Sequence, residues 1–406
     1  MTRTERTYYP IVALYSGAGW FLGPVYPLFL LSLDLDLLQI NLVLATFMIS
    51  VFLLEVPTGA VADVYGRKAS FLISCAVRSV AFGLYSVADS FTDCLIAEVI
   101  DAVGLTLASG ALDAWAVDGM RADGDEGPYD RMFARANMIV RALMVIGGVG
   151  GGYLASYDFT YAWIGGATIF AVTGLLGWML MYNDRSRRDA VKKEDRQSIP
   201  QTVLAGVKIV REAPVLLVLC LLSLGIFVAS VPAHMLWQKH FTDLSGADVS
   251  FIGWVWAIIN LATLVGSWLV PKILDRFGRE YSLAATTLLR GATLGIAAAA
   301  TELPAAIFFY LWVEVGWGLS EPMMQAWMNE HIPSAQRATA LSVRSMFMTF
   351  GGAVGLVVLG YVAREAGIPT AWGTSAIILA CVAPGFLFLG SLARRAPVAE
   401  SLVAGR

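Results

Sequence analysis

The chain has little charge for its length. Only 15% of its 406 residues are Asp, Glu, Lys or Arg, whereas 57% are hydrophobic. A soluble domain is usually about one quarter charged. Cysteine is also scarce, and the four that occur have no paired spacing, which argues against a disulfide framework and a metal site: Cys75, Cys94, Cys220 and Cys381. We expect each of them to act as a small buried hydrophobe.

Motifs that would carry chemistry are missing as well. The sequence contains no G-x-x-x-x-G-K-[ST] loop, which argues against ATP-driven work by this chain alone. It also shows no nucleophile–base–acid set and no cluster of metal ligands. We therefore predict that the chain is not an enzyme, needs no cofactor and binds no nucleic acid.

Long hydrophobic runs are what the chain has in abundance. They are roughly 20 residues long, enough to cross a ~30 Å hydrocarbon core, and they lack the alternation of a membrane barrel. In lipid such segments must satisfy their own backbone groups as helices. The polar residues 1–10 precede a full-length run without a cleavage site, so we expect the first helix to be retained. We predict twelve spans, at about 9–33, 38–61, 69–88, 92–117, 134–156, 161–182, 214–237, 247–271, 281–301, 304–328, 338–362 and 370–392.

The positive charges are distributed on one side of these spans. Of the 28 Lys and Arg residues, 22 fall in one set of links, and only Lys239 and Arg364 fall in the other. The remaining four lie inside predicted helices: Arg78, Arg141, Arg290 and Arg344. Links rich in Lys and Arg stay on the cytoplasmic side. We therefore predict a multi-pass protein of the cell (cytoplasmic or inner) membrane with both termini in the cytoplasm.

The two halves of the chain repeat each other. At an offset of 212 residues, the residues Asp63, Gly66, Arg67, Arg78 and Asp118 correspond to Asp275, Gly278, Arg279, Arg290 and Glu330. Further on the register slips, and Arg141 matches Arg344. We predict an all-α membrane protein of two pseudo-symmetric six-helix bundles, over 1–182 and 214–406. A cytoplasmic linker over 183–213 joins them, and residues 200–212 are predicted as either a surface helix or an ordinary linker helix.

The loop over residues 59–68 carries a family resemblance. Gly59, Ala62, Asp63, Gly66, Arg67 and Lys68 resemble the signature between helices two and three of the major facilitator superfamily (MFS). The twelve helices and two halves fit the fold of that family. The resemblance implies alternating access with a cytoplasmic gate, in which the loop locks the halves together and Asp118 joins its network. The alternative is that Arg67 and Lys68 only fix topology. We assign to the gate Glu55, Gly59, Asp63, Gly66, Arg67, Lys68 and Asp118, with Asp275 and Arg279 in the less well preserved second copy.

A glycine-rich run, Ile146–Tyr153, lies in the fifth span. It resembles the motif of the family's drug/proton antiporters, although Gly148 stands where the proline is expected. Plain helix packing is an equally good explanation, because glycines let helices approach closely.

Ionisable residues inside the spans are functional candidates, since a charge in the membrane costs about 3 kcal/mol or more. Glu314, Trp317, Glu321 and Gln325 form one stripe of the tenth span. The resemblance implies that helices one, four, seven and ten line a central cavity, where carboxyl groups could gain and lose protons. The candidates for proton coupling or the substrate cavity are Glu98, Asp101, Asp113, Glu314, Glu321, Gln325, Arg141 and Arg344.

A structural role competes with proton coupling for some of these residues. Arg78 could pair with Asp101, and Arg290 with Glu314, as buried charge partners between adjacent helices. Glu98 and Glu321 have no obvious partner, which favours coupling or substrate contact there. We expect His234, a lone histidine, to be satisfied locally.

The expected function is proton-coupled efflux of small hydrophobic or cationic compounds. The alternatives are an uptake symporter or facilitator for a polar nutrient, such as a sugar or carboxylate, and a non-transporting membrane receptor or scaffold. The expected partners are a small-molecule substrate, protons and the lipid bilayer, and we expect the protein to act as a monomer.

Overall fold

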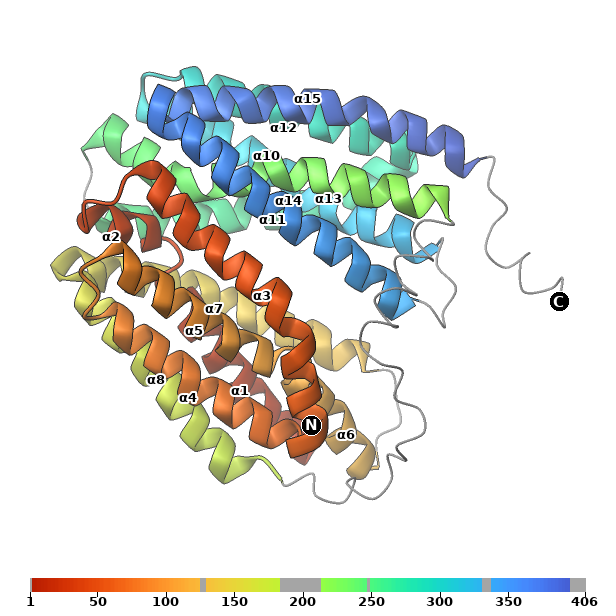
Figure 1. The fold of residues 1–406 in the computed structure, drawn as a ribbon. Coiled ribbons are helices and arrows are strands. Elements are labelled where there is room, and N and C mark those ends of the chain that lie inside the picture. Colours follow the sequence, from red (N-terminus) through yellow and green to blue (C-terminus); the bar gives the residue numbers. More distant parts are fainter. Residues whose placement is uncertain (1, 125–128, 183–212, 247–248, 331–336, 395–406) are drawn as a thin grey trace, which may run out of the picture. The chain divides into compact units, whose positions relative to one another are not determined.

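The computed structural model describes residues 2–124, 129–182, 213–246, 249–330 and 337–394, which are helices and short connections (Figure 1). The predicted linker therefore lies outside the described residues, except for its last residue. The helices are α1 (Arg3–Trp20), α2 (Tyr26–Ser32), α3 (Leu37–Tyr65), α4 (Arg67–Tyr85), α5 (Phe91–Ala108), α6 (Ala111–Ala122), α7 (Asp130–Tyr157), α8 (Phe159–Leu180), α10 (Pro214–Ser245), α11 (Val249–Phe277), α12 (Arg279–Ala299), α13 (Leu303–Glu330), α14 (Arg337–Ala366) and α15 (Ile368–Ala393).

Ten spans among the described residues have the length and composition to cross a membrane. The α1–α2 pair and α4 are not among them. The former is interrupted, and α4 carries Arg67, Lys68 and Arg78. The protein is thus a helical, multi-pass membrane protein.

Two of the spans that we predicted as continuous helices are broken, so the prediction is wrong at these points. The segment 9–33 is interrupted between α1 and α2 at residues 21–25, where Pro24 lies. The segment 92–117 is interrupted at Ser109 and Gly110, between α5 and α6. Gly110 has φ +69°, in the left-handed region that glycine enters without the cost of a Cβ.

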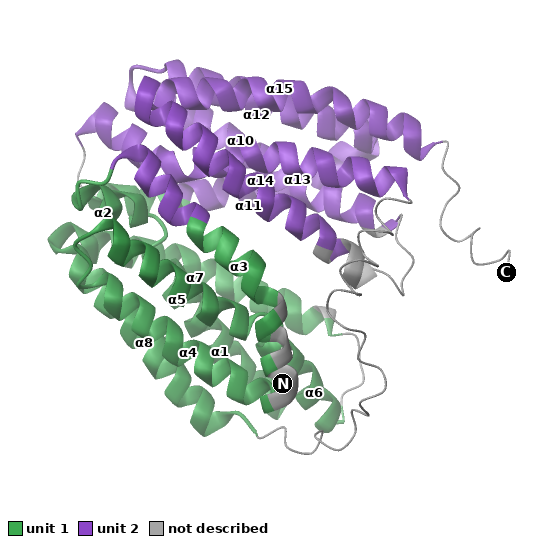
Figure 2. Ribbon diagram, viewed as in Figure 1, with its two compact units in different colours: residues 1–35, 46–195, 247–257 green, residues 36–45, 196–246, 258–406 purple. Residues whose placement is uncertain are grey.

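The chain forms two compact units (Figure 2). Unit 1 comprises residues 1–35, 46–195 and 247–257, and unit 2 comprises residues 36–45, 196–246 and 258–406. Unit 1 is thus mainly the N-terminal half of the chain and unit 2 mainly the C-terminal half. The exceptions are the first turns of α3, which belong to unit 2, and the first turns of α11, which belong to unit 1. Three of the cysteines are buried, as expected for small hydrophobes, whereas Cys381 is exposed, which corrects that expectation.

The glycine-rich run of α7 is a packing surface within unit 1. A Cβ on Gly151 would overlap the backbone carbonyl of Phe21, in the break after α1. One on Gly152 would lie 3.3 Å from the Cα of Gly253, in the first turns of α11. A side chain at either position would push these segments apart, so close helix packing accounts for the two glycines without an antiporter motif.

Candidate functional site

One arginine–carboxylate pair recurs at the start of α4 and of α12. Arg67 donates to Asp118 and to the carbonyl of Ala114. Arg279 donates through both terminal nitrogens to Glu330, with Nη2 2.7 Å from Oε1. Each arginine follows a glycine with positive φ, 93° at Gly66 and 73° at Gly278. The offset of 212 residues therefore marks a repeated contact as well as a repeated sequence.

The neighbouring residue differs between the two copies. Lys68 donates to the carbonyl oxygens of Trp178 (3.0 Å) and Met181, at the end of α8. A cation is favourable at a helix C-terminus. Glu280 stands at the matching position, and its carboxylate pairs with Arg394, the C-cap of α15. The second copy thus keeps a contact between these two helix ends, with an anion in place of the cation.

The other residues assigned to the gate are placed as follows. Gly59 and Asp63 belong to α3, but the surroundings of Gly59 and the side chain of Asp63 lie outside what the structure describes. Asp275 is exposed. Glu55 lines a cavity in unit 1 that is described below. A lock between the halves therefore stays a prediction.

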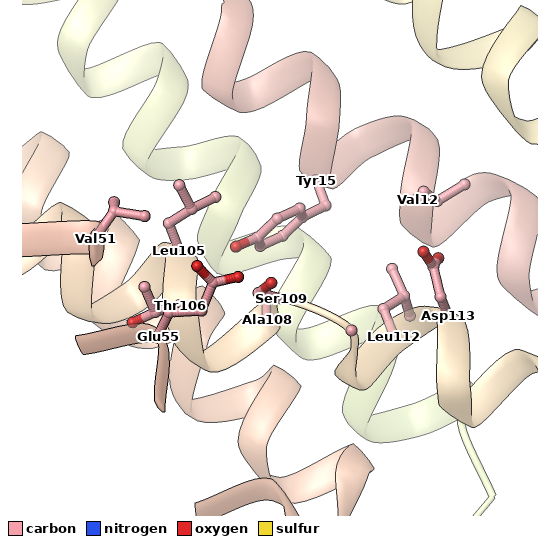
Figure 3. Close-up of a pocket in the computed structure, with 11 residues that line it drawn as sticks. Val12, Tyr15, Val51, Glu55, Leu105, Thr106, Ala108, Ser109, Leu112 and Asp113 are labelled. Atoms are coloured by element: carbon pink, nitrogen blue, oxygen red, sulfur yellow. The ribbon is translucent and has the colours of Figure 1, made fainter. Parts of the chain in front are cut away.

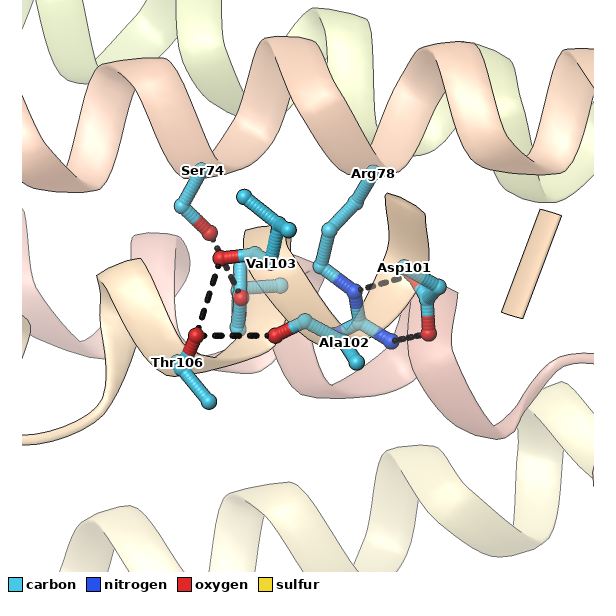
Figure 4. Close-up of polar contacts among 7 residues, drawn as sticks. Ser74, Arg78, Asp101, Ala102, Val103 and Thr106 are labelled. Carbon is cyan, nitrogen blue, oxygen red and sulfur yellow. Dashed lines mark hydrogen bonds and ion pairs between the residues drawn. The ribbon is translucent and has the colours of Figure 1, made fainter. Parts of the chain in front are cut away.

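The buried pair Arg78–Asp101 joins α4 to α5 (Figure 4). Nε lies 2.8 Å from Oδ1 and Nη2 3.1 Å from Oδ2, and each residue is 7% exposed. The guanidinium also lies 4.4 Å from the ring centroid of Phe170. A Cβ on Gly104 would overlap Cγ of Arg78. Both charges are fully occupied, so the structural pairing that competed with proton coupling for Asp101 is present.

Glu98 has a different environment one turn before Asp101. It is 5% exposed, and the hydroxyl of Tyr26 donates to its Oε1. Tyr26 is the first residue of α2, and its hydroxyl oxygen lies 2.6 Å from that of Tyr85. None of the ion pairs among the described residues includes Glu98. The sequence indicates Glu98 as a candidate. It does not indicate the break between α1 and α2 that places Tyr26 beside it.

A cavity of about 300 Å³ adjoins the break between α5 and α6 (Figure 3). Two carboxylates line it, Glu55 of α3 and Asp113 of α6, with the ring of Tyr15 between them in this view. The hydroxyl of Tyr8 donates to Asp113 over 2.6 Å. The apolar part of the wall comes from residues that include Val12, Val51, Leu105 and Leu112. This is the size of a small ligand site, with a few polar groups on an apolar wall.

Glu314 in unit 2 has a partner that the sequence did not indicate. Its Oε1 lies 3.0 Å from Nδ1 of His234, and Thr263 donates to its Oε2 over 3.3 Å. Glu314 is 3% exposed. Arg290 instead donates through Nη2 to Ser230 over 2.7 Å, and its guanidinium lies 4.8 Å from the ring centroid of Trp317. The alternative in which Arg290 pairs with Glu314 is therefore not the arrangement of the described residues.

Glu321 also has a partner, contrary to the sequence interpretation. Arg344 binds both of its oxygens, at 3.0 and 2.9 Å, and donates through Nε to Ser223 over 3.0 Å. Arg344 is 4% exposed. By contrast, Arg141 and Gln325 are exposed. Of the predicted candidates, Glu98 and Glu314 are thus the buried carboxylates without an arginine partner.

Comparison with known proteins identifies the class. A sequence model of the Major Facilitator Superfamily matches residues 9–242 and 235–404, so the chain belongs to this family of membrane transporters. It is 24% identical over 383 residues, 92% of each chain, to the MFS-type transporter YxaM of Bacillus subtilis (strain 168). It is 22% identical over 300 residues to the multidrug resistance protein MdtH of Aeromonas hydrophila subsp. hydrophila, covering 74% of this chain and 72% of that one.

The solved structures agree on the fold. The crystal structure of the nucleoside transporter NupG matches with a TM-score of 0.77 at 14% identity, over 95% of this chain and 98% of that one. The predicted MFS fold is confirmed. At this identity the likeness concerns the fold alone.

Proposed function

We propose that the protein exports small hydrophobic or cationic compounds in exchange for protons. Glu98 is the observation that carries this proposal, because it is a buried membrane carboxyl held by a tyrosine hydroxyl without a paired cation. Ionisable groups in a membrane are costly and mark substrate or proton pathways. A carboxyl that no arginine neutralises is suited to carry a proton, whereas Asp101 is already neutralised by Arg78.

The cavity at the α5–α6 break supports the substrate class. Its two carboxylates, Glu55 and Asp113, attract a cation, and its valine and leucine side chains accept apolar groups. The ring of Tyr15 adds an aromatic surface, which also favours cations. The name of the relative MdtH, a multidrug resistance protein, agrees with efflux of this kind.

The remaining parts of the proposal concern orientation and gating. The one-sided Lys and Arg distribution supports cytoplasmic termini in the cell membrane. The repeated pairs Arg67–Asp118 and Arg279–Glu330 support a role for both loop copies in alternating access. We propose that the protein works as a monomer, with one substrate pathway per chain.

The experiment uses purified protein in liposomes with an imposed pH gradient and a lipophilic cation such as tetraphenylphosphonium. The proposal expects cation movement against its gradient, driven by protons moving the opposite way. Glu98→Gln should abolish this driven movement. The variant should still exchange cations across the membrane when no pH gradient is imposed. Glu302→Gln, at an exposed residue, is the matched control.

Three results would overturn the proposal. Flux that ignores the pH gradient would exclude coupling to protons. Proton and solute movement in the same direction, with a sugar, carboxylate or nucleoside as the solute, would replace export by uptake. Absence of any flux in wild-type liposomes, with the fold intact, would favour the receptor or scaffold.

A further inference from the structure

The charged cluster of Glu314, His234 and Arg290 contains polar atoms without hydrogen-bond partners among the described residues. Arg290 is 0% exposed, and its Nε and Nη1 have no hydrogen-bond acceptor among the described residues. Oε1 of Glu314 has an ion-pair contact with His234 but no conventional hydrogen bond. A buried polar group without a partner costs free energy, most of all when it is charged. A second arrangement that joins Glu314 to Arg290 would reduce this cost.

The internal repeat explains why the two units differ. Gly104 and Gly316 correspond at the offset of 212 residues, and in both units the stem of the arginine packs against this glycine. Asp101, however, corresponds to Val313, so Glu314 is one residue further along the helix. One residue rotates a side chain by about 100° around the helix axis. Glu314 is thereby turned from the arginine of α12 toward His234 of α10 and Thr263 of α11.

We infer that Glu314 exchanges partners between His234 and Arg290, and that the proton on His234 selects the partner. This inference rests on the proposed proton-coupled function and assigns its second-half site. When the imidazole is charged, it holds the carboxylate as the structure shows. When the ring releases one proton to water, its charge is lost, and the carboxylate turns to the two unused donors of Arg290. The imidazole side chain is 26% exposed, so part of the ring is not covered by the described residues.

Histidine suits this role because its charge ordinarily changes between pH 5 and 8. The other titratable or charged groups near the cluster come from three helices. Tyr310 and Glu321 lie on α13, and Arg344 on α14 holds Glu321. His240 lies further along α10 and faces the carbonyl of Ala297. α15 has no charged residue between Ile368 and Ala393, so Arg290 and His234 are the cations that compete for Glu314.

Double-mutant cycles test the exchange without any substrate. The melting temperature of the purified protein in detergent is measured at pH 5.5 and pH 8.5 for His234→Gln, Glu314→Gln, Arg290→Gln and the two doubles that include Glu314→Gln. The His234–Glu314 coupling should be at least about 2 °C at pH 5.5 and fall at pH 8.5. The Arg290–Glu314 coupling should do the opposite. Arg290→Lys replaces Arg290→Gln if the latter does not fold.

The buried pair Arg78–Asp101 is the matched control. None of its hydrogen bonds or ion pairs in the described part of the chain involves a histidine, so its coupling should not depend on pH between these values. The inference is overturned if neither coupling around Glu314 changes with pH, or if Arg290–Glu314 coupling stays below that of His234–Glu314 at pH 8.5. Melting requires no transport, so a failure of proton-driven export in liposomes would be recognised separately. Intact exchange with flux that ignores the pH gradient would refute the proposed function alone.

Discussion

Removal of the charge on Asp101 is the most direct test of the structural reading of the Arg78–Asp101 pair. Both residues are 7% exposed and their two hydrogen bonds are 2.8 and 3.1 Å long. Breaking a buried pair leaves an uncompensated charge and costs about 3–5 kcal/mol. Asp101→Asn keeps the shape of the side chain, so this cost should appear without a cavity. At an unfolding entropy of about 2.1 cal/mol/K per residue, we expect the melting temperature of this 406-residue chain to fall by about 4–6 °C.

A compensating variant distinguishes a structural pair from a proton carrier. Replacement of a buried pair by apolar residues of similar volume is often neutral or stabilising. Arg78→Met with Asp101→Leu should therefore melt close to the wild type, because the methionine stem can occupy the space beside Gly104. The measurements are melting in detergent and proton-driven cation flux in liposomes, each per folded protein.

The reasoning would be refuted by either of two results. One is an Asp101→Asn variant that melts within about 1 °C of the wild type, because the magnitude derives from burial of the pair. The other is a double variant that regains stability but loses coupling to protons. That second outcome would move Asp101 from the structural residues to the proton pathway.

Two further predictions concern packing and the repeated surface pair. Gly151→Ala should lower the melting temperature, because the added Cβ would meet the carbonyl of Phe21, and we expect a cost of about 1–3 kcal/mol. Gly150→Ala is the control. Its added Cβ would have its nearest neighbour atom at 3.8 Å, so this variant should cost less. Arg279→Glu should destabilise by no more than about 1 kcal/mol, because Glu330 is half-exposed, and Glu330→Arg in the same chain should restore most of that loss in a melting cycle. Equal effects of the two glycine variants, or no rescue by the charge exchange, would contradict these assignments.

The two units use the same arginine in different ways. In unit 1, Arg78 is neutralised by Asp101, and the buried carboxyl of Glu98 accepts a hydrogen bond from Tyr26. In unit 2, Arg290 donates a hydrogen bond to Ser230 and lies over the ring of Trp317, and Glu314 is held by His234. A duplicated framework has thus placed a fixed pair in one half and a carboxylate with two possible partners in the other.

The sequence by itself determined the class and the fold. A long apolar segment in lipid must hydrogen-bond its own backbone groups and therefore forms a helix. The hydrophobic runs thus predicted the membrane helices, and together with the family signature they predicted the MFS architecture. The repeat also indicated which charges would correspond, and Arg67–Asp118 and Arg279–Glu330 are the result. Such features depend on local composition and on residues a fixed distance apart, and a linear sequence displays both.

Only the tertiary structure decided how the buried polar groups are paired. The helix breaks near Pro24 and Gly110 depend on what packs against them, so an uninterrupted apolar run did not reveal them. The partner of Glu314 depends on its position around the helix axis, which changes by about 100° for each residue. Counting residues into the membrane gives the depth of a side chain but not this direction. The sequence therefore shows His234 as a lone histidine, whereas in the structure its Nδ1 lies 3.0 Å from Oε1 of Glu314.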